Sequence, residues 1–117
     1  MTANELFERA IALLGYSNPN GDKAGLETLL ARTVDCINQI LSDISSDKKI
    51  SALDEEIPVF GTGLEALIYG TAMLLALSIS DNEKNVLFAG LYNIKRAAYK
   101  SSLTVRSDVL PFDDGGI

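Results

Sequence analysis

Apolar residues recur at spacings of three and four along four stretches of the chain, which is the period of an amphipathic α-helix. The pattern predicts helices over residues 3–14, 22–44, 63–79 and 82–102. The third stretch is apolar on nearly every side, so other elements have to cover its whole circumference. Because one small protomer offers limited cover, a second subunit is a candidate to cover part of it.

The most regular stripe lies in the second helix and marks its core-facing side. It is formed by Leu26, Leu29, Leu30, Val34, Ile37, Leu41 and Ile44. The stripe expected to face the core in the fourth helix comprises Val86, Leu87, Gly90, Leu91, Ile94, Ala97 and Ala98. Phe88, Tyr92 and Tyr99 follow a neighbouring face, where core or interface packing is commoner than stacking on nucleobases. The expected fold class is mainly all-α, a four-helix bundle-like domain.

Three of the four predicted helices open with serine or threonine followed three residues later by glutamate, which is the spacing of a capping box. The pairs are Thr2 and Glu5, Thr62 and Glu65, and Ser80 and Glu83. Asp22 is the expected N-cap of the remaining helix, and Gly15 suits the left-handed position just after the first one. The short corner after residue 79 predicts that the third and fourth helices pair as an antiparallel hairpin.

Residues 45–60 interrupt the helical period and predict a long connection. Pro58 excludes a helix through this point and favours an extended Ile57, so we expect one or two short β-strands near 48–51 and 56–59. A connection this long in a compact domain is often functional, although a solvated crossover between helix pairs is the more frequent case.

The C-terminal stretch combines apolar residues with poor helix formers. Pro111 and the DDGG sequence near the end argue against a helix. Residues 104–117 are therefore predicted to form an extended arm beyond a helical domain at 1–103. The apolar anchors of this arm would be Val109, Leu110 and Phe112.

Composition restricts the classes of function. The chain has 117 residues, 47% of them hydrophobic, which suffices for one domain with its own core. With 16 acidic and 10 basic residues the net charge is −6, which disfavours generic binding to nucleic acid or to an anionic membrane. The longest apolar run is shorter than the ~20 residues that span a bilayer, and the N-terminal stretch lacks the basic region and cleavage site of a signal peptide. We therefore expect a soluble cytoplasmic protein.

Candidate chemistry is sparse. The chain has no histidine and a single cysteine, Cys36, so neither a disulfide within the chain nor a typical zinc site is available. The acidic run at 54–56 is more typical of a solvated surface than of a cation site. Gly61 and Gly63 precede a helix but lack the further glycine and the lysine of phosphate-binding loops. We predict a protein that is not an enzyme, with no catalytic, cofactor-binding or metal-binding residues.

The central stretch resembles a known family. Its elements are Ile57-Pro58 before a glycine turn, an apolar helix with Ala66, Leu67, Tyr69 and Ala72, an acidic corner at 81–84, and a helix with Phe88, Tyr92, Asn93, Lys95 and Arg96. Over residues 22–103 this order is similar to the small head–tail connector proteins (adaptor or head-completion proteins) of tailed phages and prophages.

The resemblance implies a structural protein that forms an oligomeric ring on the portal and joins the DNA-filled head to the tail. Its partners would be further copies of itself, the portal protein and a tail or stopper protein. Non-specific contact with DNA in a channel is also implied, and no membrane is involved. The protein would be found in the virion, and in the host cytoplasm before assembly. The alternative is a small cytoplasmic helical protein-interaction or regulatory module.

The expected interaction residues lie in the loop, in the fourth helix and in the C-terminal arm. They are Ile50, Leu53, Val59, Phe60, Tyr92, Lys95, Arg96, Tyr99, Lys100, Val109, Leu110 and Phe112. The basic residues from Lys95 to Arg106 would face either phosphates or the acidic surface of a neighbouring copy. We favour the second, because the acidic residues of the C-terminal arm supply matching negative charge.

Overall fold

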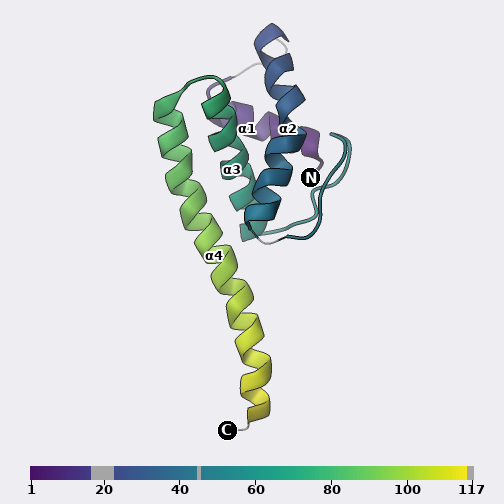
Figure 1. The fold of residues 1–117 in the computed structure, drawn as a ribbon, viewed down its shortest axis with the longest axis vertical. Helices are drawn as coiled ribbons and strands as arrows, with labels where there is room; N and C mark the ends of the chain where they lie inside the picture. The colour runs from purple at the N-terminus through teal and green to yellow at the C-terminus, as the bar shows by residue number, and fades with distance from the viewer. Residues whose placement is uncertain (17–22, 45, 116–117) are drawn as a thin grey trace.

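Four α-helices build the part of the chain that the structure describes, as the periodicity predicts. The computed structural model describes residues 1–16, 23–44 and 46–115, with side chains described from 26 onward in the second range and up to 103 in the third. The helices are α1 (Ala3–Leu13), α2 (Lys23–Asp43), α3 (Thr62–Ser78) and α4 (Asn82–Gly115). The all-α fold class is therefore confirmed (Figure 1).

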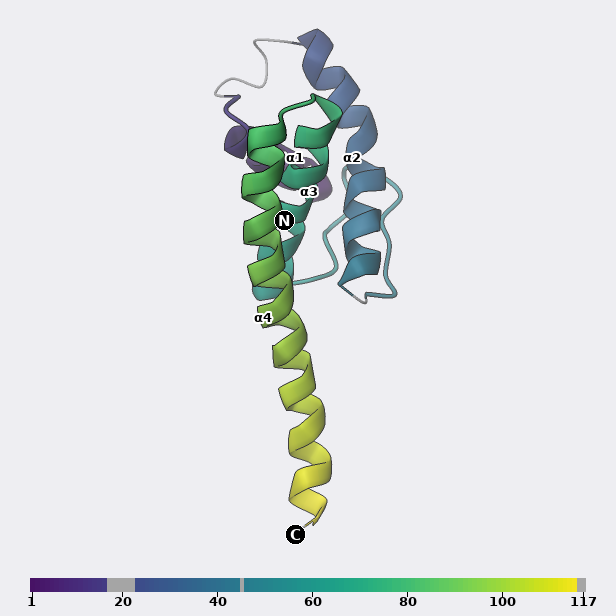
Figure 2. The same cartoon turned by 60° about the vertical axis from the view of Figure 1, so that its left-hand side comes forward.

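Helix α3 occupies the middle of the molecule. Helix α4 packs along one side of it as an antiparallel hairpin partner, α2 lies on the other side, and α1 crosses behind both α2 and α3 in the first view (Figures 1 and 2). The C-terminal half of α4 extends well beyond the other three helices, which gives the molecule a long dimension of 61 Å against 29 and 19 Å.

The chain itself covers α3 along most of its length. Leu67 and Leu75 of α3 are fully buried, and they meet Ile37 of α2 and Ile11 of α1 in two adjoining hydrophobic clusters. No second subunit is needed to cover most of this helix, although Leu77 near its end is 58% exposed. The apolar circumference of α3 therefore reflects its central position.

The predicted caps are confirmed at α1 and displaced at α3 and α4, whereas Asp22, the predicted cap of α2, lies outside the described residues. The Glu5 N–H donates to Thr2 Oγ1 (3.2 Å) and the Thr2 N–H donates to Glu5 Oε1 (2.8 Å), which completes the capping box. At α3 the cap is Gly61, whose φ of +59° suits glycine, so Thr62 is already helical and does not cap. At α4 the side chain of Asp81 accepts the Lys84 N–H (3.1 Å) in place of Ser80.

The connection between α2 and α3 holds one isolated bridge, between Thr2 and Glu56, and no longer strand among its described residues. The short strands predicted near 48–51 and 56–59 are therefore wrong. The backbone of this connection instead accepts the N–H groups that begin α1: Ala3 donates to Glu55 (2.9 Å) and Asn4 to Leu53 (2.8 Å). These acceptors satisfy donors that have no partner inside the helix.

Asn38 fixes the same connection from the side of α2. Its amide donates to the Ile50 carbonyl and its oxygen accepts the Ile50 N–H, both at 2.9 Å. Ile50 and Ile57 are buried in the core cluster beside α1 and α2. The connection is therefore packed against the helices, and it is not a purely solvated crossover.

The backbone of α4 is helical through Gly115, where an extended arm was predicted over 104–117. Pro111 removes one backbone hydrogen bond from this helix and Gly115 has a low helix propensity, so both weaken its last turns without ending it earlier. The side chains of Val109, Leu110 and Phe112 lie outside the described residues. Their role as anchors stays a prediction, as does the division between 1–103 and 104–117.

Candidate functional site

A polar cluster joins α4 to the end of α2. The Tyr92 hydroxyl donates to Asp43 Oδ2, and the Nε atom of Arg96 lies 2.9 Å from the same oxygen. Tyr92 is only 4% exposed. Burial, followed by the hydrogen bond to Asp43, raises the pKa of Tyr92 well above its usual range, so the hydroxyl stays protonated and can keep donating.

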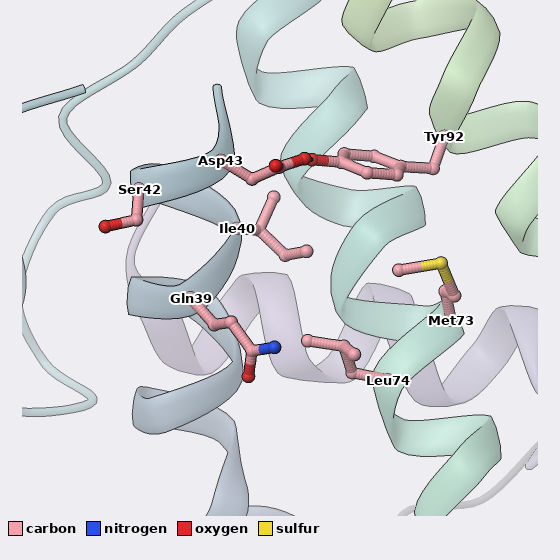
Figure 3. A pocket seen from close by; sticks show the side chains of 7 residues that line it. All are labelled: Gln39, Ile40, Ser42, Asp43, Met73, Leu74 and Tyr92. Carbon is pink, nitrogen blue, oxygen red and sulfur yellow. The ribbon is translucent and has the colours of Figure 1, made fainter. Parts of the chain in front are cut away.

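A groove of about 420 Å³ opens beside this cluster, between α2 and α3 (Figure 3). Met73 and Leu74 line it from α3, and the Tyr92 hydroxyl points toward Asp43 at one edge (Figure 3). The remaining lining residues are Gln39, Ile40 and Ser42. Tyr92 and Arg96 already bind the carboxylate of Asp43, which is the charged side chain that lines this groove. Among its described residues, the groove therefore lacks the set of free polar groups, directed at one point, that a catalytic site requires.

A second groove, of about 450 Å³, lies where the connection enters α3 and passes α4. Phe60, at 80% exposure, and Tyr99 both line it. Tyr99 also packs on Gly63, where an added Cβ would lie 2.9 Å from the ring Cε1 atom. This contact explains why the first turn of α3 carries a glycine at this position.

The predicted interaction residues of the loop divide between core and surface. Ile50 and Val59 are buried, Leu53 is half-buried against the same cluster, and Phe60 is exposed. Burial makes Ile50 and Val59 core residues, because a side chain already packed inside cannot also form a docking surface. The sequence pattern did not distinguish them from Phe60, since all are apolar residues of a stretch without helical periodicity.

The predicted residues of α4 mostly face the chain's own helices. Tyr92 is buried, Lys95 pairs with Glu65 at 3.4 Å, and Arg96 pairs with Asp43. Tyr99 and Lys100 are half-buried. The positive charges of Lys95 and Arg96 therefore meet carboxylates of α3 and α2, rather than forming an open patch for phosphates or a neighbouring copy.

The opposite side of α4 is apolar and exposed. Val86, Leu87 and Ile94 are 70%, 56% and 65% exposed, although they belong to the stripe predicted to face the core. We call this surface the outward face of α4, and it consists of Val86, Leu87, Gly90, Ile94, Ala97 and Ala98.

The orientation predicted for α4 is thus wrong, because helix 82–102 has two apolar sides and only one can face α3. The aromatic side buries larger surfaces, and its Tyr92 hydroxyl finds a partner in Asp43. Of the predicted stripe, Leu91 packs against the core. The presence of a second apolar side was the signal in the sequence for an exposed surface.

The described residues contain no cluster of three or more His, Cys, Asp or Glu side chains arranged to hold a metal ion. Within the same part of the chain, no helix combines the length and apolar character needed to cross a membrane. Neither finding adds a candidate centre to the surfaces described above.

Comparison with known proteins gives one partial similarity. No family model matches the chain, and no solved structure is significantly similar to it. The chain is similar to the small ribosomal subunit protein uS7m of Schizosaccharomyces pombe, with 40% identity over 67 residues. This region covers 54% of the chain and 26% of the relative, so the chain spans about a quarter of the length of the curated relative it matches.

The similarity to a ribosomal protein contradicts the resemblance to phage head–tail connectors. The expected function, a ring-forming connector, is therefore wrong. The expected partners are wrong as well, namely further copies of the chain, the portal protein, a tail or stopper protein, and DNA in a channel. The expected location in the virion or host cytoplasm is corrected as well. The alternative, a cytoplasmic interaction or regulatory module, gains no support from the comparison.

The physical reason for this error lies in the residues on which the resemblance rested. Ala66, Leu67 and Ala72 are buried in α3, and Phe88 and Tyr92 are buried in α4. Small and aromatic residues at these spacings are what any tightly packed helical hairpin requires. They therefore define helix packing and do not distinguish one family of helical proteins from another.

Proposed function

We propose that this chain is a non-enzymatic protein that assembles with the small ribosomal subunit. The proposal rests on the 67-residue similarity to uS7m, whose name places that relative in the small subunit. Because the chain spans 26% of the relative, the proposal concerns association with the particle and not every role of the longer protein.

The chemistry of the surface supports a binding role over a catalytic one. The sequence contains no histidine, the commonest general base. Asp43, the carboxylate at the first groove, is held by Tyr92 and Arg96. By contrast, the outward face of α4 exposes several large apolar side chains together, which is typical of a surface that another macromolecule covers.

The distribution of charge favours contact with ribosomal protein over contact with ribosomal RNA. The net charge is −6, and binding to phosphates requires lysine and arginine directed at them. Lys95 and Arg96 instead pair with Glu65 and Asp43 within the chain. The outward face of α4 contains neither lysine nor arginine.

Sedimentation of a lysate tests the proposal. The full chain, carrying a small epitope tag, is expressed in the cell that produces it, and the lysate is separated on a sucrose gradient. We expect the chain in the small-subunit fractions, and to remain there when magnesium is lowered to dissociate the two subunits. The tag fused to an unrelated small domain is the control.

A salt series distinguishes the mode of association. Contacts through phosphates weaken steeply as salt rises, whereas apolar contacts between proteins do not. We expect the chain to stay with the small subunit at salt concentrations that remove RNA-bound basic proteins. If the chain stays at the top of the gradient under all conditions, the proposed function is wrong.

A further inference from the structure

We propose that the outward face of α4 binds an amphipathic helix of a partner protein, one whose apolar stripe is flanked by lysine and arginine. The inference rests on the proposed function only for the identity of the particle that supplies this helix. The binding surface and the chemistry of the partner are argued from the chain itself.

The first argument is the spacing of the exposed side chains. Leu87, Gly90, Ile94 and Ala97 follow one another at three, four and three residues, which is the seam spacing of packed helices. Val86 and Ala98 lie along the edges of this seam. Such a narrow, straight apolar strip matches the apolar stripe of a second helix better than it matches a globular surface.

The second argument is the space above Gly90. An added Cβ there would meet no atom of the described residues within 4 Å, so none of these residues requires glycine at this position. Gly70 of α3 shows the contrast, because an added Cβ would lie 2.8 Å from Ile40 Cδ1. An exposed glycine at the centre of an apolar seam allows the backbone of a partner helix to approach closely.

The third argument is charge, which selects the partner among candidate helices. Glu83 is exposed on the same side of α4 one turn before Val86, and the whole chain carries a net charge of −6. A helix with basic flanks is attracted to this surface. A second copy of the chain would instead bring two strongly acidic molecules together, and RNA would place phosphates against a face without cations.

The experiment uses the full chain and a synthetic helical peptide as long as the outward face. The peptide carries leucine and alanine at spacings of three and four, with lysine on both flanks, and a scrambled peptide of equal composition is the reference. Binding is measured by fluorescence anisotropy. We expect the patterned peptide to bind at least about tenfold more tightly than the scrambled one.

Three variants locate the binding surface. Leu87→Glu places a charge in the seam and Gly90→Leu fills the central space. Each is expected to weaken peptide binding at least about tenfold. Leu77→Glu is the matched control, because Leu77 and Leu87 are 58% and 56% exposed but Leu77 lines a different groove, with Arg32 and Cys36 of α2. The control is expected to bind like the wild type, and circular dichroism checks that all variants remain helical.

Pelleting with purified small ribosomal subunits separates this inference from the proposed function. If the patterned peptide binds as predicted but the subunits do not, the docking surface stands and the ribosomal function fails. If subunits bind wild type, Leu87→Glu and Gly90→Leu equally well, the function stands and the docking surface is wrong. Equal binding of both peptides also overturns the inference.

Discussion

Gly70 and Gly90 are helical glycines with opposite surroundings. A Cβ added at Gly70 would lie within 3.0 Å of three side-chain carbons of Ile40, whereas one added at Gly90 would face open space. Ile40 is branched and 3% exposed, so it has little room to move. One substitution to alanine therefore has opposite effects at the two positions.

We predict that Gly90→Ala raises the free energy of unfolding by about 0.5–1 kcal/mol, because alanine loses less entropy than glycine in a helix. Gly70→Ala should lower it by about 1–3 kcal/mol, because the extra methyl group overpacks the contact with Ile40. Urea denaturation of both variants checks the prediction, which fails if the two substitutions shift stability in the same direction.

Tyr92 is predicted to make stability depend on alkaline pH. Its pKa is higher in the folded chain than the value of about 10 for a free tyrosine, so the folded state holds the proton more strongly than the unfolded state. The stabilisation is fully present below about pH 10 and is lost as the pH rises further, through the folded pKa.

The Tyr92→Phe variant should lose about 1–3 kcal/mol near neutral pH, because it removes a hydrogen bond to a charged group. The difference between wild type and Tyr92→Phe should shrink above about pH 10. Urea denaturation at several alkaline pH values measures it, with Tyr16→Phe as a control that keeps the wild-type pH dependence. A difference that stays constant with pH would falsify this role for Tyr92.

Cys36 is predicted to react slowly with thiol reagents in the folded chain. It is 9% exposed, and burial followed by the nearby charge of Asp35 raises the pKa of its thiol, which leaves less thiolate. A disulfide reagent such as DTNB should therefore modify the folded chain many times more slowly than the chain in urea. The double variant Cys36→Ala, Leu87→Cys is the control, because it moves the thiol to an exposed position and should react quickly in both states.

At the scale of elements, the connection between α2 and α3 acts as a structural part of the core. Asn38 supplies both hydrogen bonds of the Ile50 backbone, so Asn38→Ala leaves a donor and an acceptor without that partner. We predict a loss of about 1–3 kcal/mol, together with faster hydrogen exchange of the Ile50 amide. Gln39→Ala, on an exposed neighbouring position, is the control and should change neither quantity.

Periodicity predicted the existence of all four helices, because a three-to-four spacing depends only on local sequence. It did not predict which side of α4 faces α3, since that choice depends on the competing contacts of Tyr92 and Val86 with the whole fold. The caps of α3 and α4 were displaced by one residue for a related reason. Gly61 and Asp81 were alternative caps adjacent to the predicted ones, and spacing alone does not choose between neighbours.

At the scale of the whole molecule, the distal part of α4 extends away from the two core clusters (Figure 1). We predict that a chain ending at Leu103 keeps its fold, with a melting temperature close to that of the full chain. Circular dichroism should show a helical signal reduced only by the missing part of α4. Loss of cooperative unfolding in the shortened chain would contradict this prediction. A chain that ends at Val86 is the control, and it should not fold because it lacks nearly all of α4.

The sequence predicted less of the candidate site than of the fold. Ile50 and Phe60 are both apolar residues of the connection between α2 and α3, yet one is buried in the core and the other is 80% exposed. The resemblance to connectors failed because it rested on residues such as Ala66 and Leu67, whose spacing reflects helix packing. Exposure and pairing of individual side chains depend on contacts between distant segments, and no local pattern contains that information.

The bridge between Thr2 and Glu56 also sets an order of events during synthesis. The first turn of α1 donates its N–H groups to Leu53 and Glu55, so this helix leaves the ribosome before the acceptors that complete it have been made. Its buried side is equally incomplete until α3 follows. Helix α1 therefore becomes stable only after the connection and α3 have been made, and until then it is exposed to proteases and chaperones.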